Sequence, residues 1–382
     1  MKKIIFLIPT PLTQRDFTRY GVKRLQNRGF EIWFLDFTEL LNPEIITKDL
    51  VRPFPYPQTV NIKSPVDFER FFSQRKNDDL IIIDLSGKTI KCPFIDKYIR
   101  EKKIVYAVFC VNSIPRAKYQ TQGLSLISKE FWRRVSGILK RKIFDQVGAA
   151  IPQWIFAGGK YDQKDFPRID GKTKIVWAHA LDYDLYLDYE QNRKEALVTR
   201  PYVVFLDECF PFHPDFSVRG CREMPFKGPE EYCSELNEFF TVLEAKLKMP
   251  VVIAAHPRTP EGTPDMFRGR QSFQGKTIDL VAHADCVLCH GSTSINFAVL
   301  YRKPIIFLMP GKVKGDYYGN LITSFAVQFD KIPLEMASIQ SVDFKKEMMA
   351  HESLYITYQE NHIKRPETPK RFFWDIIADA IA

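Results

Sequence analysis

The sequence predicts an α/β protein built from two doubly wound parallel sheets, one in each half of the chain. Short, continuous runs rich in Ile and Val recur along the chain, which is typical of strands buried on both faces of a parallel sheet. Amphipathic stretches of helical length separate these runs. The alternation starts again near residue 196, and 382 residues are enough for two domains, each with its own core.

The first half contains five candidate strands and one clear amphipathic stretch, at residues 17–27. The strands are expected at residues 3–8, 30–35, 80–85, 104–111 and 174–178. These elements predict an N-terminal domain over residues 1–195.

The second half repeats the pattern over residues 196–365. Strands are expected at residues 202–206, 250–255, 285–289 and 304–309, and helices at 229–248, 277–282 and 294–301. A last helix, at 371–381, follows Pro366 and Pro369. We expect residues 366–382 to return to the N-terminal domain.

The composition is that of a globular protein without a membrane span. The chain is 45% hydrophobic and 26% charged, and no stretch approaches the roughly 18 apolar residues that a spanning helix needs. The apolar run near the N-terminus is too short for a signal peptide. Seven cysteines without a repeating spacing indicate reduced thiols. We therefore expect a cytoplasmic protein, and the net charge of +9 favours anionic partners.

A run of hydroxyl residues follows the predicted strand at 285–289. His290 and Gly291 end this strand, and Ser292, Thr293 and Ser294 begin the next helix. Glycine permits a tight turn, while the exposed N–H groups and positive end of a helix attract phosphate. An ordinary Ser/Thr helix cap is the alternative. The histidine and the three consecutive hydroxyls favour an anion site, so we expect these five residues to bind nucleotide phosphate.

A histidine also ends the predicted strand at 250–255. His256 is followed by Pro257 and Arg258, and the proline disfavours a helical conformation of the residue before it. An imidazole held there can donate to a phosphate or protonate a leaving group, and Arg258 can contact a second oxygen. A structural histidine is the alternative. We expect all three residues to bind the nucleotide and His256 also to act in catalysis.

Two adjacent carboxylates, Asp207 and Glu208, end the predicted strand at 202–206. Because adjacent residues on a strand point to opposite sides, we expect at most one of them to face a ligand easily. That carboxylate would act as a general base or bind a ribose; a helix cap or a loop ion pair is the alternative. Asp16, after the first strand, is a further candidate base by its position alone.

Two short patterns suggest metals. Asp182-Tyr183-Asp184 matches the D-x-D pattern that holds a divalent cation against a diphosphate, but the neighbouring tyrosines favour a packed segment. Cys286 and Cys289 form a C-x-x-C on a predicted strand, with no second pair at zinc spacing, and we interpret them as core thiols. We therefore expect no metal cofactor.

Residues 126–144 combine apolar positions at helical spacing with six Lys and Arg residues. A basic amphipathic helix with Trp and Phe can lie on an anionic membrane surface; a core-packed helix with a solvated basic face is the alternative. The first alternative predicts that residues 126–144 make a peripheral contact with the inner membrane. We find no nucleic-acid recognition motif and expect no nucleic-acid partner.

Residues 200–310 resemble bacterial surface-polysaccharide glycosyltransferases of the GT-B fold. They are most similar to capsule and lipopolysaccharide enzymes that use CMP-activated sugars, of the sialyltransferase-like and Kdo types. In that group a His-Pro motif contacts the donor phosphate and a Ser-Ser/Thr motif completes the phosphate site, as His256-Pro257 and Ser292-Thr293 would here. The acidic motif near the base is matched in part, because Cys209 follows Asp207-Glu208 where glycine is usual.

Residues 285–304 also resemble CDP-glycerol glycerophosphotransferases and nucleotide-sugar epimerases. The GT-B resemblance implies two Rossmann-like domains facing a cleft, with the acceptor on the N-terminal domain, the nucleotide sugar on the C-terminal one and a final helix that crosses back.

The function favoured is metal-independent transfer of a sugar from a nucleotide donor to a bacterial surface glycan, free or lipid-linked. The donor would be a CMP-activated nonulosonic acid or a Kdo-like sugar. The alternatives are a nucleotide-sugar 2-epimerase, a CDP-glycerol-type phosphotransferase and, among non-enzymes, a membrane-surface scaffold with an inactive fold.

Overall fold

The computed structural model describes residues 2–47, 51–75, 79–85, 92–116, 149–209, 226, 228–257, 259 and 265–382. The chain forms two compact units, defined here as unit 1 (Met1–Val111, Gln120–Leu181 and Glu367–Ala382) and unit 2 (Asn112–Tyr119 and Asp182–Pro366). The division falls at the start of helix α8 (Leu181–Gln191), whereas the sequence suggests a boundary near residue 195.

Unit 1 contains a sheet of seven parallel strands in the order β3-β2-β1-β4-β5-β6-β7. The strand order reverses between β1 and β4, as in a doubly wound sheet. The strands are β1 (Lys3–Ile8), β2 (Glu31–Asp36), β3 (Thr59–Asn61), β4 (Leu80–Asp84), β5 (Val105–Cys110), β6 (Trp154–Ala157) and β7 (Lys174–Trp177).

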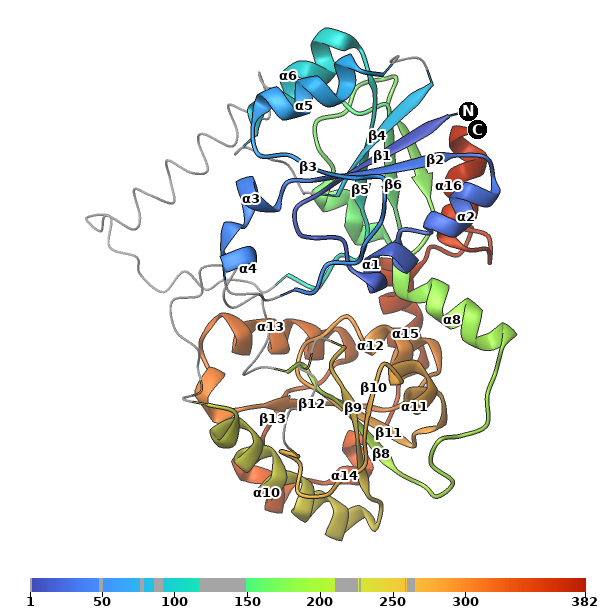
Figure 1. The fold of residues 1–382 in the computed structure, drawn as a ribbon. Helices are drawn as coiled ribbons and strands as arrows, with labels where there is room; N and C mark the ends of the chain where they lie inside the picture. The colour runs from blue at the N-terminus through green and yellow to red at the C-terminus, as the bar shows by residue number, and fades with distance from the viewer. Residues whose placement is uncertain are drawn as a thin grey trace, which may run out of the picture. The chain divides into compact units, whose positions relative to one another are not determined.

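Helices cover both faces of this sheet (Figure 1). On β1, Ile4, Phe6 and Ile8 belong to a buried cluster with α2 and α16, whereas Ile5 and Leu7 belong to a second cluster with α5 and α6. Burial on both faces explains why β1 is apolar at successive positions. The helices are α1 (Gln14–Arg19), α2 (Val22–Asn27), α3 (Thr38–Leu41), α4 (Pro43–Thr47), α5 (Pro65–Ser73), α6 (Pro93–Lys102), the 3-10 helix Lys160–Asp165 and α16 (Phe373–Ile381).

The C-terminal helix α16 packs against α2 through Trp374. Its indole Nε1 donates to the carbonyl oxygen of Arg19 at 2.8 Å, and its ring meets Phe6 edge-on at 5.4 Å between centroids. Gly21 lies beneath the indole with φ +58°, and a Cβ at this glycine would lie 2.3 Å from Trp374 Cδ1. The amphipathic stretch at 17–27 is therefore two helices, broken where the chain needs both a left-handed conformation and no side chain.

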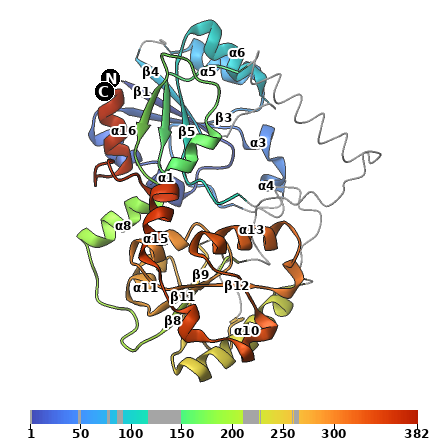
Figure 2. The same cartoon turned by 180° about the vertical axis from the view of Figure 1, so that it is seen from behind.

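Unit 2 contains a sheet of six parallel strands in the order β10-β9-β8-β11-β12-β13. Figures 1 and 2 show α12 and α13 on one face of the sheet and the long α10 on the other. The strands are β8 (Val203–Leu206), β9 (Val251–Ala255), β10 (Ser272–Gln274), β11 (Cys286–Cys289), β12 (Ile305–Met309) and β13 (Leu334–Glu335).

The helices of unit 2 that complete this description are α10 (Pro229–Leu247), α11 (Thr277–His283), α12 (Ile295–Leu300), α13 (Tyr317–Ala326), α14 (Phe344–Glu347) and α15 (Glu352–Tyr358). Short 3-10 turns occupy Gly311–Val313, Val327–Phe329 and Met336–Ser341, and a π-helical turn occupies Gln359–Ile363.

We predict that Gly21→Ala destabilises unit 1 by about 3 kcal/mol, because the new methyl group must adopt a left-handed conformation and also displace the Trp374 indole. Gly29→Ala is the matched control: Gly29 has φ +84° and nothing lies within 4 Å of its added Cβ, so only the backbone cost of about 1 kcal/mol applies. Urea unfolding followed by circular dichroism measures both losses. Equal losses would show that the contact with Trp374 does not constrain the glycine.

Candidate ligand-binding site

The carboxylate of Asp207 connects the end of β8 to the end of β9. Its Oδ1 accepts the N–H of Cys209 at 2.9 Å, and the backbone N–H of His256 also donates to this carboxylate. Burial raises the pKa of Asp207 to about 6, although both hydrogen bonds favour the ionised form and act against the rise.

The carboxylate of Glu208 connects β8 to its other neighbour, β11. The N–H of Gly291 donates to Oε1 at 2.6 Å, and the N–H of His290 also donates to this side chain. Burial raises the pKa of Glu208 to about 7, and the negative charge of Asp207 raises it further. The two adjacent carboxylates thus reach different neighbouring strands, Asp207 the end of β9 and Glu208 the end of β11.

Cys209, the residue after this pair, adopts the left-handed conformation with φ +50°. Cys209 is buried, with 3% of the residue's surface exposed. Glycine adopts this conformation without a steric penalty, whereas a cysteine adopts it at a cost in backbone strain.

His290 is fully buried, and both of its ring nitrogens have partners inside the protein. Nδ1 lies 2.9 Å from the carbonyl oxygen of Leu308, and Nε2 lies 3.2 Å from the hydroxyl of Tyr232. A carbonyl oxygen only accepts, so Nδ1 carries the proton and Nε2 accepts from the tyrosine. Burial lowers the pKa of His290 to about 4. The ring is therefore neutral at pH 7 and holds β11 to α10 and β12, in contrast to the direct phosphate contact expected from the sequence.

The turn after His290 presents backbone donors and hydroxyls. Ser292 Oγ lies 3.1 Å from Ser294 Oγ and accepts the N–H of Ser294 at 3.2 Å. In the described part of the chain, no group accepts a hydrogen bond from the N–H of Ser292 or Thr293. A Cβ on Gly291 would lie 3.3 Å from Phe325 Cδ2, so this turn packs tightly against α13.

The loop after β9 is fixed by a glutamine on β10. The Nε2 atom of Gln274 lies within hydrogen-bond distance of three carbonyl oxygens, those of His256 (3.2 Å), Pro257 (3.3 Å) and Thr259 (2.9 Å). His256 is half-buried at this strand end, and Pro257 is exposed. Arg258 lies outside the described residues.

Asp16 belongs to unit 1 and caps helix α1. Thr13 Oγ1 donates to Asp16 Oδ2 at 2.7 Å and accepts the N–H of Asp16 at 3.1 Å. The side chain is thus used in a reciprocal capping interaction, which stabilises the N-terminus of a helix.

The two patterns that suggested metals include buried residues. Asp182 is buried at the start of α8 and accepts Nδ2 of Asn296 at 3.1 Å. Cys286 and Cys289 are fully buried on β11. Within the described ranges, no group of three or more His, Cys, Asp and Glu side chains is arranged to hold a metal ion.

The basic stretch at 126–144 lies outside the described residues. No helix in the described part of the chain is long and apolar enough to cross a membrane.

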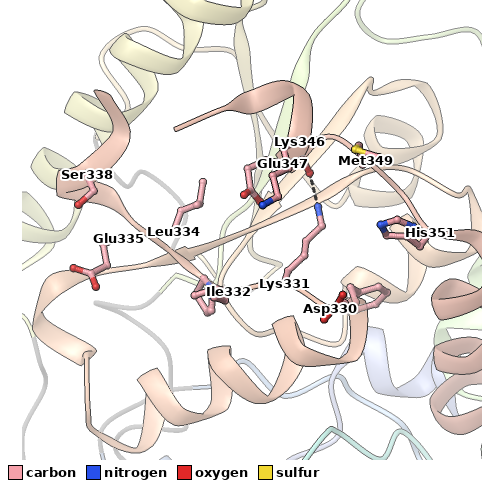
Figure 3. Close-up of a pocket in the computed structure, with 12 residues that line it drawn as sticks. Asp330, Lys331, Ile332, Leu334, Glu335, Ser338, Lys346, Glu347, Met349 and His351 are labelled. Carbon is pink, nitrogen blue, oxygen red and sulfur yellow. Dashed lines mark hydrogen bonds between the residues drawn. The ribbon is translucent and has the colours of Figure 1, made fainter. Parts of the chain in front are cut away.

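A separate cavity of about 580 Å³ lies beside the edge strand β13 in unit 2 (Figure 3). None of the residues that the sequence singles out lines it. Two of its charged side chains are engaged: Glu335 pairs with Lys314, and Lys331 Nζ donates to the carbonyl oxygens of Ile305 (2.7 Å) and Glu347. We therefore favour the edge formed by the ends of β9, β8 and β11 as the ligand-binding site over this cavity.

Sequence reasoning missed Tyr232 and Gln274, the side chains that orient His290 and the loop after β9. Both come from elements other than the strands that they support. No local motif marks them, and only the strand order brings them there.

We predict that the stability of the wild-type protein falls relative to Glu208→Gln as the pH rises from about 4.5 to about 7. The folded-state pKa of Glu208 is raised, so the folded protein holds this proton more tightly than the unfolded chain, and the stabilisation is lost as the carboxyl ionises. The relative change is about 3 kcal/mol, measured by urea unfolding at pH 4.5 and pH 8. A difference that does not vary with pH would contradict the buried, proton-holding state.

Comparing Cys209→Gly with Cys209→Ala tests the strained turn. Both substitutions remove the thiol, but only glycine relieves the left-handed strain, so the glycine variant should be more stable by about 1 kcal/mol. Thermal unfolding measures the difference, and a more stable alanine variant would refute the strain.

No protein-family model and no curated protein sequence matches the chain. Solved structures are similar along its whole length. The wall teichoic acid polymerase TagF is 9% identical, with a TM-score of 0.55 over 100% of this chain and 88% of that one. The UDP-GlcNAc 2-epimerase of Methanocaldococcus jannaschii is 13% identical, with a TM-score of 0.51 over 100% and 99%. These similarities confirm the predicted fold: two Rossmann-like α/β domains of the GT-B type.

Proposed function

We propose that unit 2 binds the phosphate of a nucleotide sugar and that the protein transfers the sugar to a glycan. The observation that carries this proposal is the edge where β9, β8 and β11 end. There the half-buried carboxylates of Asp207 and Glu208 hold the His256 loop and the Gly291 turn, and the N–H groups of Ser292 and Thr293 have no acceptor among the described residues. Ligands of doubly wound sheets bind at this edge.

The donors at this edge suit a departing phosphate. The N–H groups of Ser292 and Thr293 and the hydroxyls of residues 292–294 can surround phosphate oxygens without adding charge, and His256 can donate to a further oxygen. Fixed donors aimed at developing negative charge are usually the largest electrostatic contribution to such catalysis. His290 and Tyr232 act as positioning residues, and Arg258 is proposed as a further phosphate ligand.

The general base is proposed to come from the carboxylate pair. A base works best when its pKa lies near the working pH, and the pKa values of Asp207 and Glu208 are about 6 and about 7. Asp207 is the more ionised of the two at neutral pH and is therefore our first choice to take the proton of the acceptor hydroxyl. Asp16 is our last choice because its carboxylate caps α1.

The donor that we propose is a CMP-activated nonulosonic acid or Kdo-like sugar, and the acceptor is a bacterial surface glycan, free or lipid-linked. The motif resemblance of His256-Pro257 and Ser292-Thr293 supports this donor. No metal takes part in the proposed reaction. We further propose that the protein acts in the cytoplasm, with residues 126–144 contacting the inner membrane.

A second candidate is a nucleotide-sugar 2-epimerase, favoured by the similarity to the Methanocaldococcus jannaschii enzyme. A phosphotransferase acting on a CDP-linked donor is a third, favoured by the similarity to TagF. Incubation with the donor alone distinguishes the first, because only an epimerase converts a sugar nucleotide without an acceptor. The glycosyltransferase and the phosphotransferase are distinguished by the group that they transfer, a sugar or phosphoglycerol.

A thermal-shift screen against CMP, CDP, UDP and GDP tests the binding proposal. A ligand that binds only the native state raises the Tm by mass action, equivalent to about 2.7 kcal/mol at one hundred times its Kd. We expect the largest shift with CMP. No shift with any of the four nucleotides would refute nucleotide binding, and the largest shift with UDP would favour a UDP-sugar enzyme.

We predict that His256→Ala lowers turnover by about 10²–10⁴-fold, the usual contribution of a general acid or positioned donor. Transfer is measured with the sugar nucleotide of the base that raises the Tm most. His351→Ala is the matched control, because this exposed histidine lines the cavity beside β13 in the same unit. Loss of activity in the control with normal activity in His256→Ala would move the site to that cavity.

A further inference from the structure

A second cavity, of about 480 Å³, lies in unit 1 at the edge where the strands begin. Its walls come from the starts of β4, β5, β6 and β7, the end of α6 and the end of α16. Figure 1 marks both ends of the chain beside this edge. It is the edge opposite to the strand ends of unit 1, so it is not the position at which a doubly wound sheet ordinarily takes its ligand.

Positive charge dominates this cavity. Lys102, Lys103 and Lys174 line it, and none of them forms an ion pair with any described residue. The fourth lysine, Lys2, is already engaged, because its Nζ donates to the carbonyl oxygen of Ile381 at 2.9 Å and to Ala382. Asp79 is the only side-chain carboxylate among the lining residues.

Local helix chemistry explains part of this arrangement. Lys102 and Lys103 end helix α6, where cations interact favourably with the helix dipole. The dipole of α6 does not explain Lys174, which comes from the start of β7. The Nζ atom of Lys174 lies 4.9 Å from the ring centroid of Trp154. The parallel register places Trp154 opposite Lys174. The fold therefore brings a third ammonium group and an aromatic wall to two lysines more than 70 residues away in sequence.

Unpaired like charges around one cavity repel each other and attract an anion. The lining side chains carry four lysine charges and one aspartate charge, an excess of three positive charges, although Lys2 already has backbone acceptors. A phosphate monoester carries a charge close to −2 at pH 7.5. Lysines suit phosphate as mobile point charges, and the indole of Trp154 offers an apolar surface to the carbon skeleton of the ligand.

We propose that this cavity binds a phosphate monoester through Lys102, Lys103 and Lys174, at a site separate from the nucleotide site proposed in unit 2. Free sugar phosphates and membrane lipids with a terminal phosphate monoester carry the same chemistry. The site does not depend on the function proposed for unit 2.

The test uses the full chain and glycerol 3-phosphate as the probe, titrated by calorimetry at low salt. The triple variant Lys102→Gln, Lys103→Gln, Lys174→Gln should bind at least about tenfold more weakly, because three exposed charge contacts are lost. The control is Lys23→Gln, Lys248→Gln, Lys370→Gln, which makes the same change in net charge at exposed lysines. Lys248 ends a helix in the left-handed conformation, as Lys103 does. The control should bind as the wild type does.

Two readouts assign the binding to this cavity. Glycerol 3-phosphate should change the tryptophan emission of the wild type, and most of this change should be absent in Trp154→Phe. His256→Ala should leave the affinity unchanged, whereas a parallel loss there would place the phosphate in unit 2 and overturn the proposal. Equal binding by the two lysine variants would also overturn it.

Vesicles separate the two sources of the phosphate. Phosphatidylcholine vesicles containing phosphatidic acid present a monoester, and those containing phosphatidylglycerol present a diester. Binding of glycerol 3-phosphate and of phosphatidic acid vesicles, both lost in the lysine triple variant, supports a monoester site open to lipid; binding of glycerol 3-phosphate alone supports a site for a free ligand. Equal binding of both vesicle types without glycerol 3-phosphate would overturn the proposal in favour of a general anionic surface contact.

Discussion

The site region of unit 2 depends on two adjacent, half-buried carboxylates at the end of β8. Parallel strands end with polar backbone groups at one edge of the sheet, and these groups need partners when they are buried. At the end of β9, Asp207 accepts the N–H of His256. At the end of β11, Glu208 accepts the N–H groups of His290 and Gly291. The same surroundings raise the pKa of Asp207 to about 6 and that of Glu208 to about 7, so both groups titrate near neutral pH. One arrangement therefore shapes the strand ends and also gives them acid–base chemistry.

The surrounding side chains keep this edge in a single arrangement. Tyr232 and the carbonyl of Leu308 fix the neutral His290 ring from two sides, and Gln274 holds the loop that carries His256. Cys209 accepts a strained backbone conformation so that its N–H can reach Asp207. Each of these contacts comes from a different element, so the edge is built by the whole α/β unit and not by a single motif.

The sequence predicted most interior strands of both sheets because buried parallel strands are continuous apolar runs. β1, β9 and β12 lie within one residue of their expected bounds. Four strands were missed: the edge strands β3, β10 and β13 have only two or three residues and are partly exposed, and the interior strand β6 has only four residues. For His290 the sequence could not indicate the role of the ring, because that role depends on a tyrosine 58 positions earlier. Arg258 and residues 126–144 stay predictions.

The contact between Trp374 and the turn at Arg19–Gly21 joins residues 355 positions apart, and this separation has a consequence for biosynthesis. Chains are made from the N-terminus, and domains generally fold as they emerge. The sheet of unit 1 is complete once residue 177 has been made, yet its α16 face stays uncovered until the ribosome reaches residue 381. Unit 2 is synthesised in the interval. During that time the side of β1 that carries Phe6 lacks the cover of α16. We expect this apolar face to be the part of the nascent chain that a chaperone binds, and the part that aggregates if translation stops early.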